Sequence, residues 1–243
     1  MRHRFVTARG IRFHVAETGD PGAPPVVLLH GWPSNWYCWR DHFGPLADAG
    51  MRPIAIDLRG FGWSEATKRG YRKHQLALDI LAVLDAMGID RFRLVGHDWG
   101  GYGAFLLGIS QPDRVEKLVL VNTGHAYAPR DLETVKALGS FWYMLLVGAP
   151  VIGPALNRAG VIPNAVIKQC VAEGSWTEED GRIYFDHIDP VAAQQVYGSF
   201  TYGGESLSAV RGKFADTRLR MPTLFLYGDR DVAIKPPLLR GID

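Results

Sequence analysis

The 243-residue sequence predicts an α/β protein in which a mostly parallel sheet is flanked by helices. Short apolar runs alternate with segments of helix length, and each run ends in Gly, Asp or Asn at a turn. Parallel strands that are covered on both faces read as near-continuous hydrophobic runs. The strand rhythm stops over residues 126–214, where helix-like sequence punctuated by Gly and Pro takes over. We therefore expect a core made of residues 1–125 and 215–243, with residues 126–214 inserted as a helical cap.

The expected elements follow in order along the chain. A hairpin opens it over 4–10 and 11–17, and buried strands follow over 24–31, 52–60, 92–98, 115–122 and 222–229. Apolar residues at helical spacing predict a helix over 74–88, and a second helix is expected from Gly100 to Pro112. The apolar stretch 141–156 is shorter than a bilayer span and is broken by Gly and Pro, so we expect it to cover an apolar cavity rather than to cross a membrane.

Composition and charge exclude several classes of partner. The 27 Lys and Arg residues are scattered and nearly balanced by 25 Asp and Glu, so no basic patch for nucleic acid is expected. Cys38 and Cys170 are too few for a disulfide scaffold and are expected to be packing residues. The N-terminus lacks the uninterrupted apolar core of a signal peptide, which favours a cytoplasmic location. The sequence does not indicate whether the protein is a monomer or an oligomer.

The stretch Gly96-His97-Asp98-Trp99-Gly100 has the spacing of a nucleophile elbow, with an acid at its centre. It follows an expected strand and precedes an expected helix, which is the context that an elbow requires. A carboxylate is a weak acyl nucleophile but is suited to displacing a leaving group from a saturated carbon, which forms an alkyl ester. The simpler alternative is that Asp98 only caps the following helix.

Four motifs in order make the chain resemble the α/β-hydrolase fold family, and within it the epoxide hydrolases and haloalkane dehalogenases. They are HGWP (30–33), DLRGFGWS (57–64), GHDWGG (96–101) and LYGDRD (226–231). The resemblance implies that Asp98 is the nucleophile and that the backbone N–H groups of Trp32 and Trp99 form the oxyanion hole. It also implies that Asp231 is the acid that orients the base, with Asp229 as the alternative, and that the reaction needs no metal or organic cofactor.

The same resemblance favours epoxide opening to a vicinal diol. The epoxide hydrolases donate a proton from cap tyrosines, and the aligned residues are Tyr184 and Tyr143, with Tyr197 and Tyr202 in reserve. A phenol stays neutral at pH 7 and can donate to an alkoxide-like oxygen. The apolar residues between Phe141 and Leu146 predict a small hydrophobic substrate.

The resemblance also implies a water-activating histidine beyond Asp231, whereas the last histidine here is His187. His125, just past the expected strand 115–122, is the histidine nearest to the active edge of the expected sheet, although nothing in the pattern places it on Asp231. We therefore expect that the last strand and helix of the fold are missing, and that Asp98 is alkylated without efficient release. The alternatives are a haloalkane dehalogenase and a binding protein that does not turn over.

Overall fold

A mixed sheet forms the centre of the molecule. The structure, a computed structural model, describes residues 1–125, 127, 129, 131–170, 177–205, 214, 216–231 and 233–241. The strands are β1 (Arg2–Ala8), β2 (Ile11–Glu17), β3 (Pro25–Leu29), β4 (Arg52–Ile56), β5 (Phe92–His97), β6 (Val115–Val121) and β7 (Thr223–Leu226). Their order across the sheet is β1-β2-β4-β3-β5-β6-β7. Strands β3 to β7 run parallel, and β1 and β2 form the antiparallel hairpin. The predicted α/β class is confirmed.

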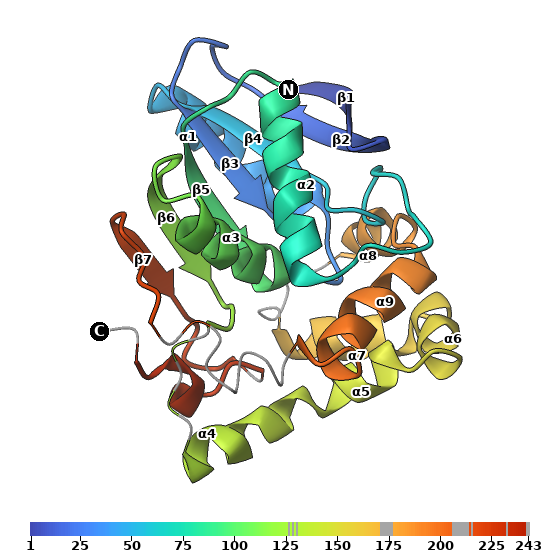
Figure 1. Ribbon diagram of the computed structural model, residues 1–243. Helices are drawn as coiled ribbons and strands as arrows, with labels where there is room; N and C mark the ends of the chain where they lie inside the picture. The colour runs from blue at the N-terminus through green and yellow to red at the C-terminus, as the bar shows by residue number, and fades with distance from the viewer. Residues whose placement is uncertain are drawn as a thin grey trace.

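The central strands are buried because helices cover both of their faces. Val27, Ile54 and Phe92, on β3, β4 and β5, are each 0% exposed. The core helices are α1 (Phe43–Asp48), α2 (Lys73–Ala86) and α3 (Asp98–Ser110), and η1 (Trp36–His42) precedes α1. Figure 1 shows α2 and α3 side by side over one face of the sheet. Helix α3 begins at Asp98, two residues before the predicted start, because the elbow residue itself enters the first helical turn.

Between β6 and β7 the chain forms a set of helices that we call the helical insertion. Its elements are α4 (Leu132–Ala137), η2 (Leu138–Phe141), α5 (Trp142–Gly148), α6 (Ile152–Arg158), α7 (Val161–Cys170), α8 (Glu178–Phe185) and α9 (Pro190–Thr201), and η3 (Pro236–Leu239) follows β7. The arrowheads of the parallel strands point toward this insertion in Figure 1. The predicted boundary residues 126, 215 and 243 and the side chain of Cys170 lie outside the described residues.

Helix α9 joins the helical insertion to the core. Asp189 caps its N-terminus by accepting from the N–H groups of Val191 and Ala192 at 2.9 and 2.8 Å. Its inner face buries Ala192, Val196 and Tyr197, each at most 1% exposed. A bridge between Phe61 and Ile188 just before the helix adds a backbone link to the core. The carboxyl ends of the strands are therefore covered by α9 and its neighbours.

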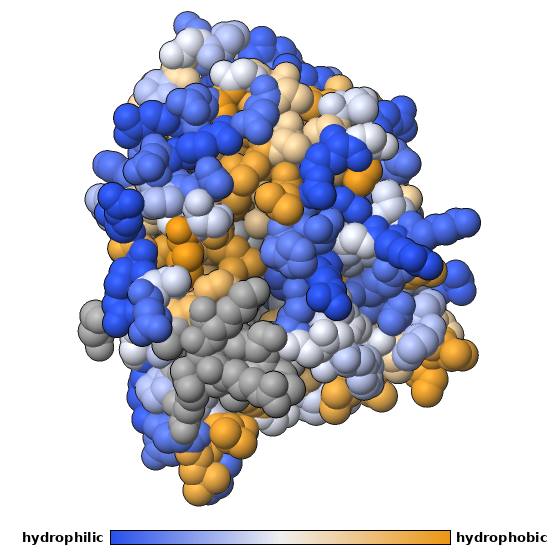
Figure 2. Space-filling model, in the orientation of Figure 1, coloured by the Kyte–Doolittle hydropathy of each residue, from blue (hydrophilic) through white to orange (hydrophobic). Residues whose placement is uncertain are grey.

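The prediction that residues 141–146 line a cavity is wrong for three of them. Trp142, Leu145 and Leu146 are 64%, 52% and 39% exposed, whereas Met144 and Val147 are buried. Helix α5 turns one face to α9, so residues on its other face meet solvent. Figure 2 shows apolar residues along the lower edge of the molecule, where Figure 1 places α4 to α6.

No single described helix has the length and apolarity to span a bilayer. The stretch Leu132–Gly148 meets those criteria only together with Ile152–Arg158, from which it is bent by 92°.

Candidate active site

The turn between β5 and α3 holds Asp98 in a left-handed backbone conformation. Its φ of +50° is uncommon for a residue with a side chain and marks a strained turn. Gly100 allows the turn, since a Cβ there would overlap the carbonyl oxygens of Leu29 and His30. A Cβ on Gly31 would overlap the Asp98 carboxyl group itself. The two glycines therefore let the elbow and the loop after β3 approach each other closely.

Two backbone N–H groups donate to the Asp98 carboxyl group. The N–H of Trp32 donates to Oδ2 at 2.8 Å, and the N–H of Trp99 also stabilises the carboxylate. Thr123 fixes the elbow from the end of β6, because its Oγ1 donates to the Asp98 carbonyl at 2.7 Å. The Trp32 N–H therefore distinguishes Oδ2 from Oδ1.

Burial raises the pKa of Asp98 to about 7 from its ordinary value of 3.8. The N–H groups of Trp32 and Trp99 and the ammonium of Lys73 oppose this rise, and Asp231 adds to it. A carboxylate with a raised pKa is more basic than an exposed one and is poorly solvated, which suits a nucleophile.

Asp231 lies at the carboxyl edge of the sheet, after β7. Its Oδ2 accepts from Nδ2 of Asn122, and its Oδ1 accepts from the N–H groups of Ala233 and Ile234 at 2.7 and 2.8 Å. The negative charge of Asp231 disfavours the ionised form of Asp98 and so raises the pKa of Asp98. Asp229, the alternative acid, is exposed.

Four aromatic rings form a cluster beside Asp98. The ring of Tyr197 lies 5.2 Å from the rings of both Trp32 and Trp99, and 6.1 Å from that of Tyr143. Tyr143 in turn stacks at 6.4 Å on Trp32. Burial, the neighbouring Tyr143 and the charge of Asp98 together raise the pKa of Tyr197 well above its ordinary value. The Tyr197 phenol is therefore neutral at pH 7 and able to donate.

Comparisons with known proteins agree with this geometry. Residues 24–149 match the family model described as the alpha/beta hydrolase fold. The chain belongs to the α/β-hydrolase fold family. This hydrolase is 31% identical to epoxide hydrolase 1 of Siraitia grosvenorii, with 98% of this chain and 83% of the relative aligned. It is 40% identical to epoxide hydrolase 3 of Xenopus tropicalis over 62% of this chain and 42% of that protein.

A solved structure gives the same result. The epoxide hydrolase VrEH1 from Vigna radiata superposes with a TM-score of 0.78 at 28% identity, covering 96% of this chain and 80% of that one. The resemblance to the epoxide hydrolase branch, stated from four motifs, is confirmed. The prediction that the chain is an enzyme is also confirmed.

Tyr184 of the hydrolase lies in a different neighbourhood from the aromatic cluster. Its hydroxyl accepts from Arg40 at 3.4 Å, and its ring meets that of Tyr37 at 6.0 Å. Helix α8 holds it against η1, since Asn35 Nδ2 donates to the Ile183 carbonyl at 2.9 Å. Tyr202, the other reserve, is 59% exposed and donates to the Leu145 carbonyl. The reserve residue Tyr197 is the one beside Asp98.

No histidine among the described residues is hydrogen-bonded to Asp231. His125 is turned toward Phe225, with its ring 5.8 Å away, and its Nδ1 accepts from the Tyr127 N–H. Burial lowers the pKa of His97 to about 4, with Asp231 opposing the shift, so His97 is neutral at pH 7. No group of three or more His, Cys, Asp or Glu side chains in the described part of the chain is placed to hold a metal ion.

Sequence reasoning missed Asn122, Thr123 and Lys73. Asn122 and Thr123 directly follow β6, and the carboxyl ends of parallel strands are where such folds place polar site residues. That position was a usable signal. Lys73 gave none, because it sits between Arg72 and His74 in a basic run that is typical of an exposed helix start.

Proposed function

We propose that the hydrolase opens epoxides through an alkyl ester on Asp98. The observation that carries the proposal is the pairing of Oδ2 with the Trp32 N–H at 2.8 Å, which leaves Oδ1 to attack. The names of the relatives support the epoxide class over other alkylating substrates. The proposed nucleophile separates this reaction from acyl transfer by a serine elbow.

In the first step, Oδ1 forms a bond to one ring carbon and the carbon–oxygen bond of the epoxide breaks. The departing oxygen takes the phenol proton of Tyr197, and the phenolate later regains a proton from water. Tyr143 supports the donor, since its ring lies 6.1 Å from that of Tyr197. A positioned phenol of this kind contributes about 10²- to 10⁴-fold to such a step.

In the second step, water adds to Cγ of the ester. The negative charge that develops on Oδ2 is held by the N–H groups of Trp32 and Trp99, which already face this carboxyl group. Collapse breaks the Cγ–Oδ1 bond, so the diol leaves with Oδ1 and Asp98 regains an oxygen from water. Asp231 would orient the base that activates this water.

The release step depends on the base that Asp231 would orient, so ester formation is the step that the test follows. The substrate class follows from the aromatic cluster: rings of Trp32, Trp99, Tyr143 and Tyr197 next to Asp98 suit a small hydrophobic epoxide.

The test is intact mass spectrometry after incubation with styrene oxide. We expect an increment of one styrene oxide on the wild-type chain, mapped by peptide digestion to Asp98 and absent from Asp98→Asn. Labelling of both chains to the same extent would assign the increment to nonspecific alkylation. An unlabelled wild-type chain over a panel of terminal epoxides would overturn the proposal.

Dehalogenation is the second candidate, favoured by one observation. The indole Nε1 of Trp32 is buried and has no hydrogen-bond partner among the described residues. Indole N–H groups next to a carboxylate nucleophile can hold a departing halide. Phenethyl bromide has the carbon skeleton of styrene oxide, so an alkyl increment with bromide release from this probe alone would favour the dehalogenase over the epoxide hydrolase.

A further inference from the structure

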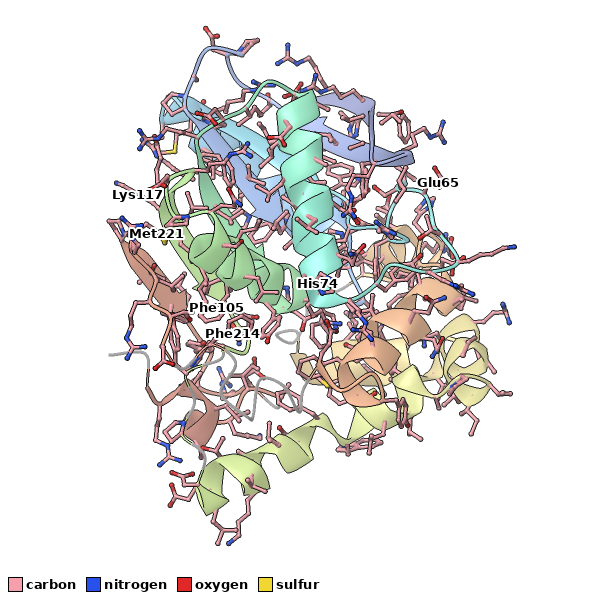
Figure 3. All side chains as sticks on the ribbon, viewed as in Figure 1. Glu65, His74, Phe105, Lys117, Phe214 and Met221 are labelled. Atoms are coloured by element: carbon pink, nitrogen blue, oxygen red, sulfur yellow. The ribbon has the colours of Figure 1, made fainter. Side chains whose placement is uncertain are left out.

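Lys73, the first residue of α2, is buried between the core and the helical insertion. The residue is 2% exposed, and its Nζ donates to the carbonyl of Val196 on α9. Nζ also lies 4.0 Å from the centre of the Trp99 ring and 5.6 Å from that of Phe200. In Figure 3, the next residue, His74, marks the end of α2 that faces the helical insertion.

The position is costly for a lysine. Lysine is almost never fully buried unless it is paired, and a cation at the first turn of a helix faces the positive end of the helix dipole. The contacts with the Val196 carbonyl and the Trp99 ring offset part of this cost, because the face of an indole ring attracts a desolvated cation.

The charged and titratable groups around Lys73 come from several elements. Glu205, after α9, accepts from the Lys73 backbone N–H at 3.0 Å and from Ser199 Oγ at 3.1 Å. Asp98 at the elbow attracts the ammonium electrostatically. Besides burial, Glu205 raises the pKa of Tyr102 on α3, and Asp98 raises the pKa of Tyr197 on α9. His74 Nδ1 lies 3.9 Å from Glu205 Oε1.

We propose that Lys73 is a positioning residue that ties α9 to the nucleophile elbow and so sets the place of the Tyr197 phenol above Asp98. The inference rests on the proposed function and assigns a role to a residue outside the reacting groups. Lys73 touches Trp99, the residue after the nucleophile, and the carbonyl of Val196, the residue before Tyr197. A single ammonium thus connects the backbone segments that carry the nucleophile and the proton donor.

The charge state of Lys73 gives this link a pH dependence. Burial lowers the pKa of Lys73 to about 7, with Glu205 and Asp98 opposing the shift. A neutral amine keeps a hydrogen bond to Val196 but loses its attraction to the Trp99 ring and to the Asp98 carboxylate. The link therefore weakens as the pH rises above about 7.

The test compares Lys73→Met and Lys73→Arg with Lys117→Met, an exposed control on β6 on the side of the molecule away from α9 (Figure 3). Two readouts are used: the rate of ester formation with styrene oxide by intact mass, and amide hydrogen exchange of residues 190–201. We expect Lys73→Met to lower the saturating rate about tenfold or more, with the half-saturating concentration changed less than about threefold. Lys73→Arg should recover part of the rate.

Exchange in α9 should be faster in Lys73→Met and unchanged in Lys117→Met. A rate within about twofold of wild type in Lys73→Met would overturn the positioning role even if exchange rises, because Lys73 would then only stabilise the fold. Unchanged exchange would overturn the link itself. If the wild-type chain forms no ester, the proposed function fails, while the exchange result still decides whether Lys73 holds α9.

Should Lys73→Met not fold, wild-type exchange in α9 at pH values on either side of about 7 takes its place, with faster exchange expected on the alkaline side.

Discussion

The backbone N–H of Trp32 donates to Oδ2 of Asp98 at 2.8 Å, across a separation of 66 residues in the chain. The loop after β3 and the elbow after β5 are brought together because β3 and β5 are neighbours in the sheet. This contact distinguishes the two carboxyl oxygens before any substrate arrives. Asp98 itself has a strained backbone and a desolvated carboxyl group, so its surroundings affect stability as well as chemistry.

Asp98→Asn should stabilise the fold while it removes ester formation. Asparagine tolerates the left-handed φ of +50° and carries no charge to be desolvated. The pKa of Asp98 is about 7 in the folded state and 3.8 ordinarily, so the folded state binds more protons between these values and wild-type stability falls as pH rises through them. The gain in Tm from Asp98→Asn should therefore be larger at about pH 8 than at about pH 5.

Scanning calorimetry at the two pH values checks this prediction. In a chain of this size, each kcal/mol of added stability raises Tm by about 2–4 °C. A melting temperature that is lower than wild type at both values would show that the carboxylate stabilises the folded state, contrary to the direction of its pKa shift.

The rate of ester formation should rise with pH through about 7, because only ionised Asp98 attacks. Lys73 loses its charge over the same range, so the wild-type profile should reach a maximum near neutral pH and then fall. In Lys73→Met the falling limb should disappear. The rising limb should move to higher pH, since the ammonium lowers the pKa of Asp98. Intact mass spectrometry of samples quenched at set times with styrene oxide measures both limbs across the pH range. Identical pH profiles for the wild-type chain and Lys73→Met would contradict an effect of Lys73 on Asp98.

Tyr197→Phe should slow ester formation far more than Tyr184→Phe. Loss of a positioned proton donor costs about 10²-fold or more, whereas Tyr184 contacts Arg40 and Tyr37 rather than the aromatic cluster. Both variants keep the ring and remove one hydroxyl, so each is a control for the other. A larger loss in Tyr184→Phe would return the role of proton donor to the residue that the family resemblance indicated.

The elbow and the loop after β3 were predictable from the sequence because they depend on short motifs whose glycines are required by close backbone approach. The strands were predictable for a similar reason, since each is a continuous apolar run. The family resemblance indicates Tyr184 before Tyr197, and the sequence alone does not place Tyr197 beside Asp98 because tertiary packing positions the side chains of the insertion helices. Lys73 could not be identified at all: the Val196 carbonyl that holds it lies 123 residues away. Local sequence carries no information about such a contact.

Gly31→Ala should disable the site, while Gly103→Ala should not. A Cβ on Gly31 would overlap the Asp98 side chain, so the loop or the elbow must shift and the Trp32 N–H would lose its place on Oδ2. A Cβ on Gly103, inside α3, meets nothing within 4 Å, and alanine there should stabilise the helix by about 1 kcal/mol. We expect ester formation to fall about 10²-fold in Gly31→Ala, the loss typical of one oxyanion-hole donor or of a misplaced nucleophile. Gly103→Ala should melt higher and react at the wild-type rate. A Gly31→Ala chain that is alkylated as fast as wild type would show that the paired Oδ2 is not needed for attack, and the assignment of Oδ1 as the nucleophilic atom would fail.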